Sequence, residues 1–225
     1  MRGGGAGVLA ALALVGVAVT GCGGEAGSGS GTGSGTGSRA GGKAEGDAKS
    51  PSARSEAVRL SPAELQSRWW TWAASEPEAT NPVADEDGGD CARNQPDDVW
   101  FLAGTFGTTG NRRACSVPDG VPLAFPLVNL IGDEGDCADF MSTAGGSAVL
   151  DGKKVAEVTR KGDAITVTAV DGNPVTQSSG TFATTGCGLW VQVPAPEPGR
   201  HTLTIRGRSG DFATGVDYVL TVKGS

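Results

Sequence analysis

The stretch Val99-Trp100-Phe101-Leu102-Ala103 is apolar at every position, which is the pattern of a strand covered on both faces. A strand with one face in water would instead alternate apolar and polar residues. The segment therefore predicts a sheet that has packed side chains above and below it. One of these two layers must come from another element of the chain.

A tryptophan-rich helix is predicted shortly before this strand and is the natural cover for one of its faces. Ser61-Pro62-Ala63-Glu64 has the form of a capping box with proline at the first helical position. Leu65, Trp69 and Trp72 then recur at helical spacing, and the step Glu76-Pro77 ends the helix. We expect this stripe to pack on the sheet as part of the core.

The rest of the chain reads as short strands separated by turns rich in Gly and Pro. The dipeptide Asp151-Gly152 indicates a two-residue hairpin, and Pro122 and Pro126 mark their strand as an edge or bulged strand. Residues 171–185 are predicted to form a long polar loop. The fold class that follows is mainly β: an antiparallel β-sandwich or jelly-roll-like domain over residues 57–225, with one N-terminal helix. The expected strands are 99–103, 112–117, 121–130, 147–150, 153–158, 163–170, 187–193, 201–205 and 216–222.

Four cysteines of this domain predict two disulfides, because an exported domain keeps its thiols oxidised. Four cysteines allow three connectivities. We favour Cys91–Cys115, which brackets a predicted hairpin, together with Cys137–Cys187. A zinc site is the alternative, but the sequence has no Cys-x-x-Cys pair and its one histidine is His201.

The expectation of export comes from the first 22 residues. Arg2 precedes an apolar run over residues 8–19, and Val19-Thr20-Gly21-Cys22 closes the segment. This pattern resembles a bacterial lipoprotein precursor with its lipobox. The resemblance implies that residues 1–21 are a signal peptide and that Cys22 carries lipid at the outer face of the cytoplasmic membrane. An ordinary signal peptide with an incidental cysteine is the alternative.

Composition divides the remaining chain into a linker and one domain. Residues 22–56 hold long Gly/Ser/Thr alternations, which predict a flexible linker. All five Trp, all six Phe and the one Tyr lie after residue 56. The chain has 25 acidic residues against 18 Lys and Arg, a net charge of −7, and no basic cluster in its sequence. This balance argues against nucleic acid and anionic lipid as partners.

The domain also resembles a family of uncharacterised secreted bacterial proteins rich in β structure. The resemblance covers most of residues 57–225, and it implies a fold and a compartment but no activity. The stretches that carry it are Trp69–Trp72 with Asn81-Pro82, Cys91 through Val99–Gly104, Arg113–Pro118 leading to Phe125–Asn129, Pro198–Leu203, and Tyr218–Val222.

Two acidic clusters are candidate cation sites, because crowded carboxylates repel one another and Ca²⁺ prefers oxygen ligands. One cluster spans residues 76–98 and the other 133–139. Asp85, Asp87 and Asp90 are the best trio of ligands for Ca²⁺, although their spacing is not that of an EF-hand. Two solvated acidic loops are the alternative.

Trp190 and Trp70 are the candidate ligand-binding residues. Alternation in the strand 187–193 places Trp190 on the face opposite Leu189 and Val191, where it is either exposed as a stacking platform or buried under a loop or the helix. Trp70 lies off the apolar stripe of the predicted helix and is expected to be the more exposed indole of that helix.

Catalytic signatures are sparse in this sequence. It lacks a Gly-x-Ser-x-Gly elbow and a His-Glu-x-x-His motif, and His201 falls on the core side of its strand. We therefore predict a lipid-anchored, non-enzymatic binding domain for a cell-envelope glycan or protein, with no cofactor other than Ca²⁺. A carboxylate-dependent hydrolase of envelope glycans is the alternative, since any two adjacent Asp or Glu could serve it.

Overall fold

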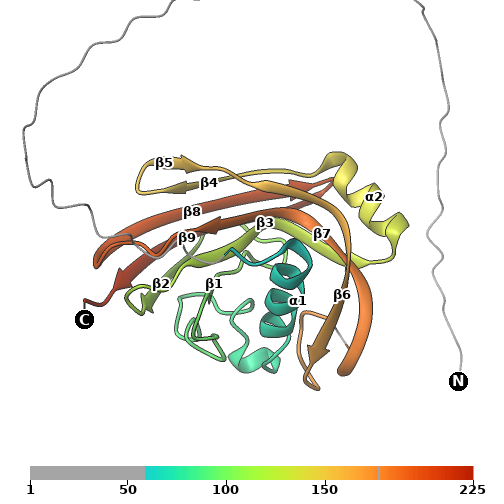
Figure 1. Cartoon of the computed structure of the whole chain (residues 1–225), viewed down its shortest axis with the longest axis horizontal. Coiled ribbons are helices and arrows are strands. Elements are labelled where there is room, and N and C mark those ends of the chain that lie inside the picture. The colour runs from blue at the N-terminus through green and yellow to red at the C-terminus, as the bar shows by residue number, and fades with distance from the viewer. Residues whose placement is uncertain (1–58, 177, 225) are drawn as a thin grey trace, which may run out of the picture. The chain divides into compact units, whose positions relative to one another are not determined.

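The computed structural model describes residues 59–176 and 178–224 (Figure 1). The predicted signal peptide, the predicted lipidation site Cys22 and the predicted linker lie outside these residues. No helix among the described residues has the length and apolar character needed to cross a membrane. The elements in chain order are α1 (Pro62–Ala73), η1 (Glu78–Thr80), β1 (Trp100–Phe101), β2 (Asn111–Val117), β3 (Leu123–Gly132), α2 (Glu134–Thr143), β4 (Gly145–Leu150), β5 (Lys153–Val155), β6 (Val158–Ala169), β7 (Gly180–Val193), β8 (Gly199–Ser209) and β9 (Phe212–Val222).

The strands form two sheets, which confirms the mainly β prediction. Sheet A has the order β1-β3-β7-β6, and sheet B has the order β2-β9-β8-β4-β5. Most neighbours are antiparallel, but β1 runs parallel to β3 and β2 runs parallel to β9. The predicted antiparallel arrangement therefore holds for most strand pairs but not for the pairs made by β1 and β2. Alternation along a strand shows which residues are buried, but it does not reveal the direction of the neighbouring strand.

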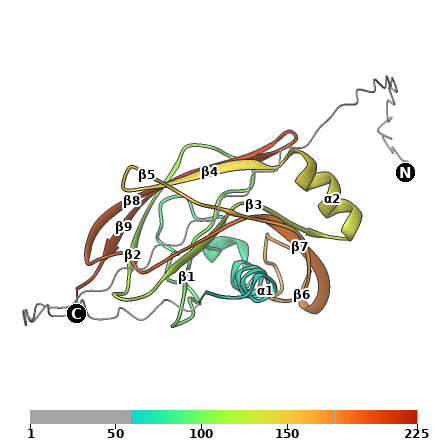
Figure 2. The same cartoon turned by 45° about the horizontal axis from the view of Figure 1, so that its top comes forward.

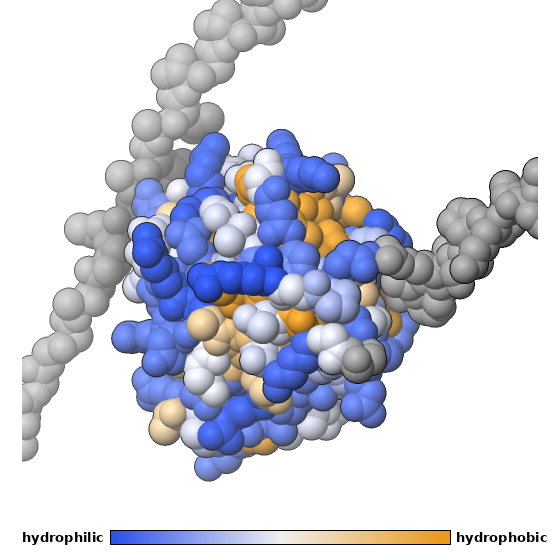
Figure 3. Space-filling view, turned by 90° about the vertical axis from the view of Figure 1, so that its left-hand side faces the viewer, coloured by the Kyte–Doolittle hydropathy of each residue, from blue (hydrophilic) through white to orange (hydrophobic). Residues whose placement is uncertain are grey.

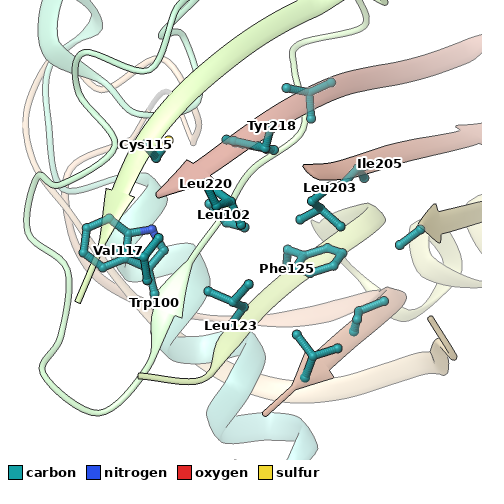
Figure 4. Close-up of a cluster of buried hydrophobic side chains, with 14 of the residues drawn as sticks. Trp100, Leu102, Cys115, Val117, Leu123, Phe125, Leu203, Ile205, Tyr218 and Leu220 are labelled. Atoms are coloured by element: carbon teal, nitrogen blue, oxygen red, sulfur yellow. The ribbon is translucent and has the colours of Figure 1, made fainter. Parts of the chain in front are cut away.

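A hydrophobic core fills the space between the two sheets (Figure 4). Leu123 and Phe125 of β3 point into it from sheet A, and Leu203, Ile205 and Leu220 point into it from sheet B. All five side chains are buried. The two sheets therefore pack face to face across one continuous apolar layer.

Helix α1 covers the other face of sheet A (Figures 1 and 2). Trp69 and Trp72 pack there with Phe101 of β1 and Trp190 of β7, and the rings of Trp69 and Trp190 meet edge to face at 5.6 Å. The Nε1–H of Trp69 donates to the carbonyl of Leu102 at 2.9 Å. The prediction of a strand with two covered faces, one of them covered by the tryptophan helix, is confirmed.

The N-terminus of α1 differs in one detail from the prediction. The Ser61 hydroxyl accepts a hydrogen bond from the Glu64 amide at 3.4 Å, as expected of an N-cap. The Glu64 carboxylate, however, lies 3.6 Å from Arg68 one turn later rather than closing a capping box. A full capping box occurs instead in α2, between Asp133 and Asp136.

Helix α2 corrects the prediction of an acidic loop at residues 133–139. The side chains of Asp133 and Asp136 bond each other's backbone amides at 2.8 and 3.0 Å, which satisfies two of the donors that a helix start leaves free. Cys137 is buried and ties the helix to β7. The spacing Asp-x-x-Asp was therefore a start signal for a helix and not a sign of a loop.

The turn and bulge predictions hold, whereas the long loop is shorter than expected. Asp151 and Gly152 have φ values of 48° and 75°, as a type I′ turn requires. The register of β3 with β7 shifts between Pro126 and Val128, which is the predicted bulge. Strand β7 already begins at Gly180, so the polar loop predicted for 171–185 ends before that residue.

Both predicted disulfides are present. Cys91 pairs with Cys115 and Cys137 pairs with Cys187, with Cα atoms 5.8 Å apart in each pair. The hairpin that motivated the first pair does not exist, because β1 and β2 belong to different sheets. Instead, the loop around Cys91 lies along the edge of β2, where the Ala114 amide donates to the Asp87 carbonyl at 2.8 Å.

Arg113 occupies a core-facing position of β2 and is almost fully buried. Its guanidinium donates to main-chain carbonyls and to the Tyr218 hydroxyl, which lies 2.9 Å from Nη1. The carbonyl acceptors, at 2.7–3.1 Å, belong to Val83, Asp85, Ala103 and Gly104. One side chain thus connects the loop before β1, the segment after β1 and strand β9.

We predict that Arg113→Ala lowers the free energy of unfolding by about 3–5 kcal/mol, because it leaves several buried acceptors without a donor. Arg112→Ala is the matched control: Arg112 is the exposed neighbour on the same strand and should change stability by less than about 0.5 kcal/mol. Urea unfolding measures both values. Equal midpoints for the two variants would contradict the structural role of Arg113.

Candidate functional site

An apolar pocket of about 180 Å³ lies at the margin between the two sheets. Strand β1 pairs with β3 over two residues only, and the segment Gly104–Phe106 then leaves β3 and turns toward β9. The gap between this segment and the bulged part of β3, Pro126–Asn129, forms the pocket. Trp69 and Trp70 of α1 contribute a further wall.

The bulge in β3 shapes one wall of the pocket through a close approach to sheet B. A Cβ atom added to Gly207 of β8 would lie 1.9 Å from the carbonyl oxygen of Leu127. Only glycine allows the two backbones to come this close. Leu127, Val128 and Pro126 are therefore held at the pocket by backbone packing as well as by side-chain contacts.

Two exposed phenylalanines stand at this pocket. Phe106 is 48% exposed and Phe212 is 39% exposed, and both belong to the pocket lining. Only two other large apolar side chains among the described residues, Val158 and Val170, are comparably exposed. Single exposed apolar residues are ordinary, but two aromatic rings beside one apolar pocket are typical of a binding surface.

Hydrogen bonds hold the pocket wall in place. The Thr105 amide donates to the Thr214 hydroxyl at 2.7 Å, and the two hydroxyl oxygens are 3.1 Å apart. The indole Nε1–H of Trp70 and the amide nitrogen of Asn129 are enclosed without hydrogen-bond partners. Neighbouring atoms cover both nitrogens, so a ligand would reach them only after a shift of the lining side chains.

The pocket size limits what can enter. A cavity of about 150 Å³ holds a benzene molecule, whereas sites for drug-sized ligands begin at about 300 Å³. A volume of about 180 Å³ therefore fits one ring or one branched alkyl group. The arrangement suits a single apolar group of a larger ligand.

The two predicted tryptophan sites have different surroundings. Trp70 is 7% exposed and lines the pocket. Trp190 does lie on the face of β7 opposite Leu189, but helix α1 covers that face and leaves Trp190 only 1% exposed. Trp190 is therefore not an exposed stacking platform.

The acidic trio forms a loop in which each carboxylate has a partner from the protein. Asp85 is 9% exposed and accepts hydrogen bonds from the amides of Asp87, Gly88 and Asp90 at 2.9–3.2 Å. Asp90 accepts a hydrogen bond from Arg93 at 2.6 Å. Within the part of the chain that the structure describes, no three acidic, His or Cys side chains form a group that could hold a metal ion.

His201 has two acceptors, which explains its position beside the β4–β5 turn. Its Nδ1 lies 2.6 Å from the Asp151 carboxylate, and its Nε2 lies 2.7 Å from the Glu197 carbonyl oxygen. The hydrogen bond to Asp151, followed by the one to Glu197, raises the pKa of His201. The imidazolium donates at both nitrogens, whereas a neutral ring would donate at only one.

Two further pockets open on the surface, but neither has a pair of acidic lining residues. One lies beside Trp100 and has Asp119 in its lining, and the other lies beside α1 and has Glu64. A glycosidase requires two carboxyl groups across the bond that it cleaves.

On the face shown in Figure 3, hydrophilic side chains prevail and apolar surface is confined to patches between them.

Comparison with protein-family models, with curated proteins and with solved structures found no match to this chain. The site is therefore interpreted from its own geometry.

Sequence reasoning missed most of the residues around the pocket. Phe106 stands in a Gly/Thr-rich connection and Phe212 directly follows the Gly210-Asp211 turn. An aromatic residue in a polar turn has no core pattern to explain it, and this signal could have identified both. Asn129 and Thr214 gave no such signal, because each continues an ordinary strand.

We predict that the His201–Asp151 pair makes stability depend on pH. The pKa of His201 is raised in the folded state, so the stabilisation is complete below the unfolded value of about 6.5 and is lost as pH rises through the folded value. Relative to His201→Gln, the wild-type protein should lose stability as pH rises above about 6.5 and through the raised pKa of His201.

Thermal unfolding at several pH values measures this difference. Asp151→Asn is the companion variant, because Asn tolerates the left-handed backbone of the turn while the carboxylate is removed. Asp151→Asn should reduce the dependence of the melting midpoint on pH in the same way as His201→Gln. Parallel profiles for the wild type and both variants would contradict the assignment.

Proposed function

We propose that this protein is a non-enzymatic binding domain, held at the outer face of the cytoplasmic membrane through lipid on Cys22. Its finer classification as a β-sandwich, jelly-roll-like fold is part of the same proposal. The observation that carries the binding function is the apolar pocket with Phe106 and Phe212 exposed beside it. The ligand class is a cell-envelope glycan or protein that carries at least one apolar group.

The energetics of the pocket support an anchoring role. A ring that buries about 150 Å² of apolar surface gains about 4 kcal/mol. This corresponds to a Kd of about 1 mM for the free ring. Useful affinity therefore requires that the ring be one part of a larger ligand, with further contacts outside the pocket.

The alternative, a carboxylate-dependent hydrolase of envelope glycans, has less support. Several carboxylates are engaged in ion pairs with arginine, among them Asp98 with Arg68 and Asp163 with Arg160. None of the three pockets described above combines two acidic residues. A binding role requires only the pocket.

We predict that benzene binds at the pocket with a Kd of about 1–10 mM. Titration followed by NMR should move the indole N–H signal of Trp70, assigned through Trp70→Phe, before the other indole signals. Val175→Trp adds a large side chain at the pocket lining and should weaken binding at least tenfold.

Val158→Trp is the matched control, since it makes the same substitution at an exposed site on β6. It should leave the Kd within about twofold of the wild type. Equal weakening by the two variants, or no movement of the Trp70 signal, would contradict the pocket as the binding site. Release of reducing sugar from envelope glycan would favour the hydrolase.

We also predict that Cys22 is the lipidation site. The Cys22→Ala precursor should not incorporate labelled fatty acid, because the thiol that forms the thioether is absent. Metabolic labelling and membrane fractionation measure the outcome. Normal labelling and membrane retention of the variant would contradict the proposed anchor, whereas the pocket experiment does not depend on it.

A further inference from the structure

The outer face of sheet B presents a stripe of arginine and threonine along its central strand. In β8, Leu203, Ile205 and Gly207 face the core, so the alternate positions face outward. Helix α1 packs on sheet A, and no described element packs on this outer face. The outward positions of β8 are Arg200, Thr202, Thr204, Arg206 and Arg208.

Small residues on the neighbouring strands let the arginine side chains lie across the sheet. A Cβ atom on Gly215 would lie 3.1 Å from Cδ of Arg206, and one on Gly145 would lie 3.8 Å from the guanidinium of Arg208. Arg206 continues to Asp217, where Nη2 is 2.8 Å from the carboxylate. Arg200 and Arg208 are exposed.

The charge of this face is opposite to that of the chain. Asp217 is the one acidic residue at the outward strand positions of sheet B, and Arg206 pairs with it. The chain as a whole has a net charge of −7. The cations at outward positions are Arg112, Lys154, Arg200, Arg206 and Arg208.

The acidic loop determines on which part of this basic face an anion can bind. The loop that contains Asp87 lies along the outer edge of β2, where the Ala114 amide donates a hydrogen bond to the Asp87 carbonyl. Repulsion therefore disfavours an anion at that edge. The favourable path runs along β8 and toward β4 and β5, where Lys154 adds a further positive charge.

We propose that this face binds a linear polymer of phosphodiester-linked polyol units. Outward positions of a strand recur about every 6.6 Å. Thr204 and Arg206 are engaged with Asp217 in the middle of β8, so an extended polymer with one phosphate per short unit meets donors at the two ends of the strand, from Arg200 and Thr202 and from Arg208. Arginine suits phosphate because its planar fork donates two parallel hydrogen bonds. This surface is separate from the pocket, and it does not depend on the proposed function.

Single-stranded nucleic acid also carries phosphodiesters, but it fits this face less well. Such sites combine a basic surface with aromatic side chains on which the bases stack. None of the outward residues on the five strands of sheet B is aromatic. The face therefore offers recognition of the backbone without a platform for bases.

The test compares two double variants of the full chain that remove the same charge. Arg200→Gln with Arg208→Gln removes two cations from the face, and Arg59→Gln with Lys161→Gln removes two exposed cations from elsewhere. Binding to immobilised poly(glycerol phosphate) is measured at about 50 and 200 mM salt. The immobilised comparison polymers are hyaluronan and oligothymidylate.

We expect the wild type to bind poly(glycerol phosphate) with an affinity that falls at least tenfold between the two salt concentrations, as for a few released counterions. The face variant should lose at least tenfold in affinity at low salt, and the control variant less than about twofold. Val175→Trp, which fills the pocket, should bind the polymer as the wild type does. Melting midpoints of both double variants should stay within about 2 °C of the wild type.

Several results would overturn the proposal. Equal losses in the two double variants would show a general charge effect, and absence of wild-type binding would remove the polymer as a partner. Oligothymidylate or hyaluronan bound as tightly as poly(glycerol phosphate) would assign the face to another polyanion. Salt-sensitive self-association without polymer would assign it to a second copy of this chain.

Discussion

The buried guanidinium of Arg113 is the interaction on which the other parts of this domain depend. A charge this deep is stable only when its donors are satisfied, and here main-chain carbonyls and one tyrosine hydroxyl do so without any carboxylate. Two of these acceptors belong to Val83 and Gly104, which also line the apolar pocket. The residue that ties the loops to the sheets therefore also sets the pocket wall. Its neighbour Arg112 points the other way, to the basic face, so a single strand contributes to both surfaces.

Local sequence rules predicted the helices, turns and bulges of this fold better than they predicted which strands pair with each other. The N-cap at Ser61, the turn at Asp151 and the bulge at Pro126 are set by a few adjacent residues, and each is present. The Cys91–Cys115 pair was predicted correctly from a hairpin that does not exist. The direction of β1 and β2, and the sheet to which each belongs, depend on contacts distant in sequence. The alternation of apolar and polar residues along a strand does not indicate those contacts.

The same limit applies to the candidate site. Alternation placed Trp190 on the correct face of β7, but whether that face meets solvent depends on α1, which begins more than a hundred residues earlier. The acidic residues around Asp85 have the composition of a cation site. In the structure, however, the Asp85 carboxylate accepts hydrogen bonds from backbone amides. The basic face was invisible as a cluster because the arginine at position 112 is distant in sequence from those in β8.

The pocket and the basic face lie on opposite faces of sheet B, and the β8–β9 hairpin contributes a residue to each. Ser209 pairs with Phe212 and Arg208 pairs with Ala213, so an aromatic ring of the pocket and an exposed guanidinium lie on adjacent rungs of one hairpin but point to opposite faces of the sheet. The pocket alone supports binding of about 1 mM, and a few phosphate contacts alone are weakened by salt. A polymer that carried an apolar substituent would engage both surfaces only by passing around the end of this hairpin, and the second contact would then form at a high effective concentration. The β8–β9 turn is therefore the place where a substituted anionic polymer would pass from one surface to the other.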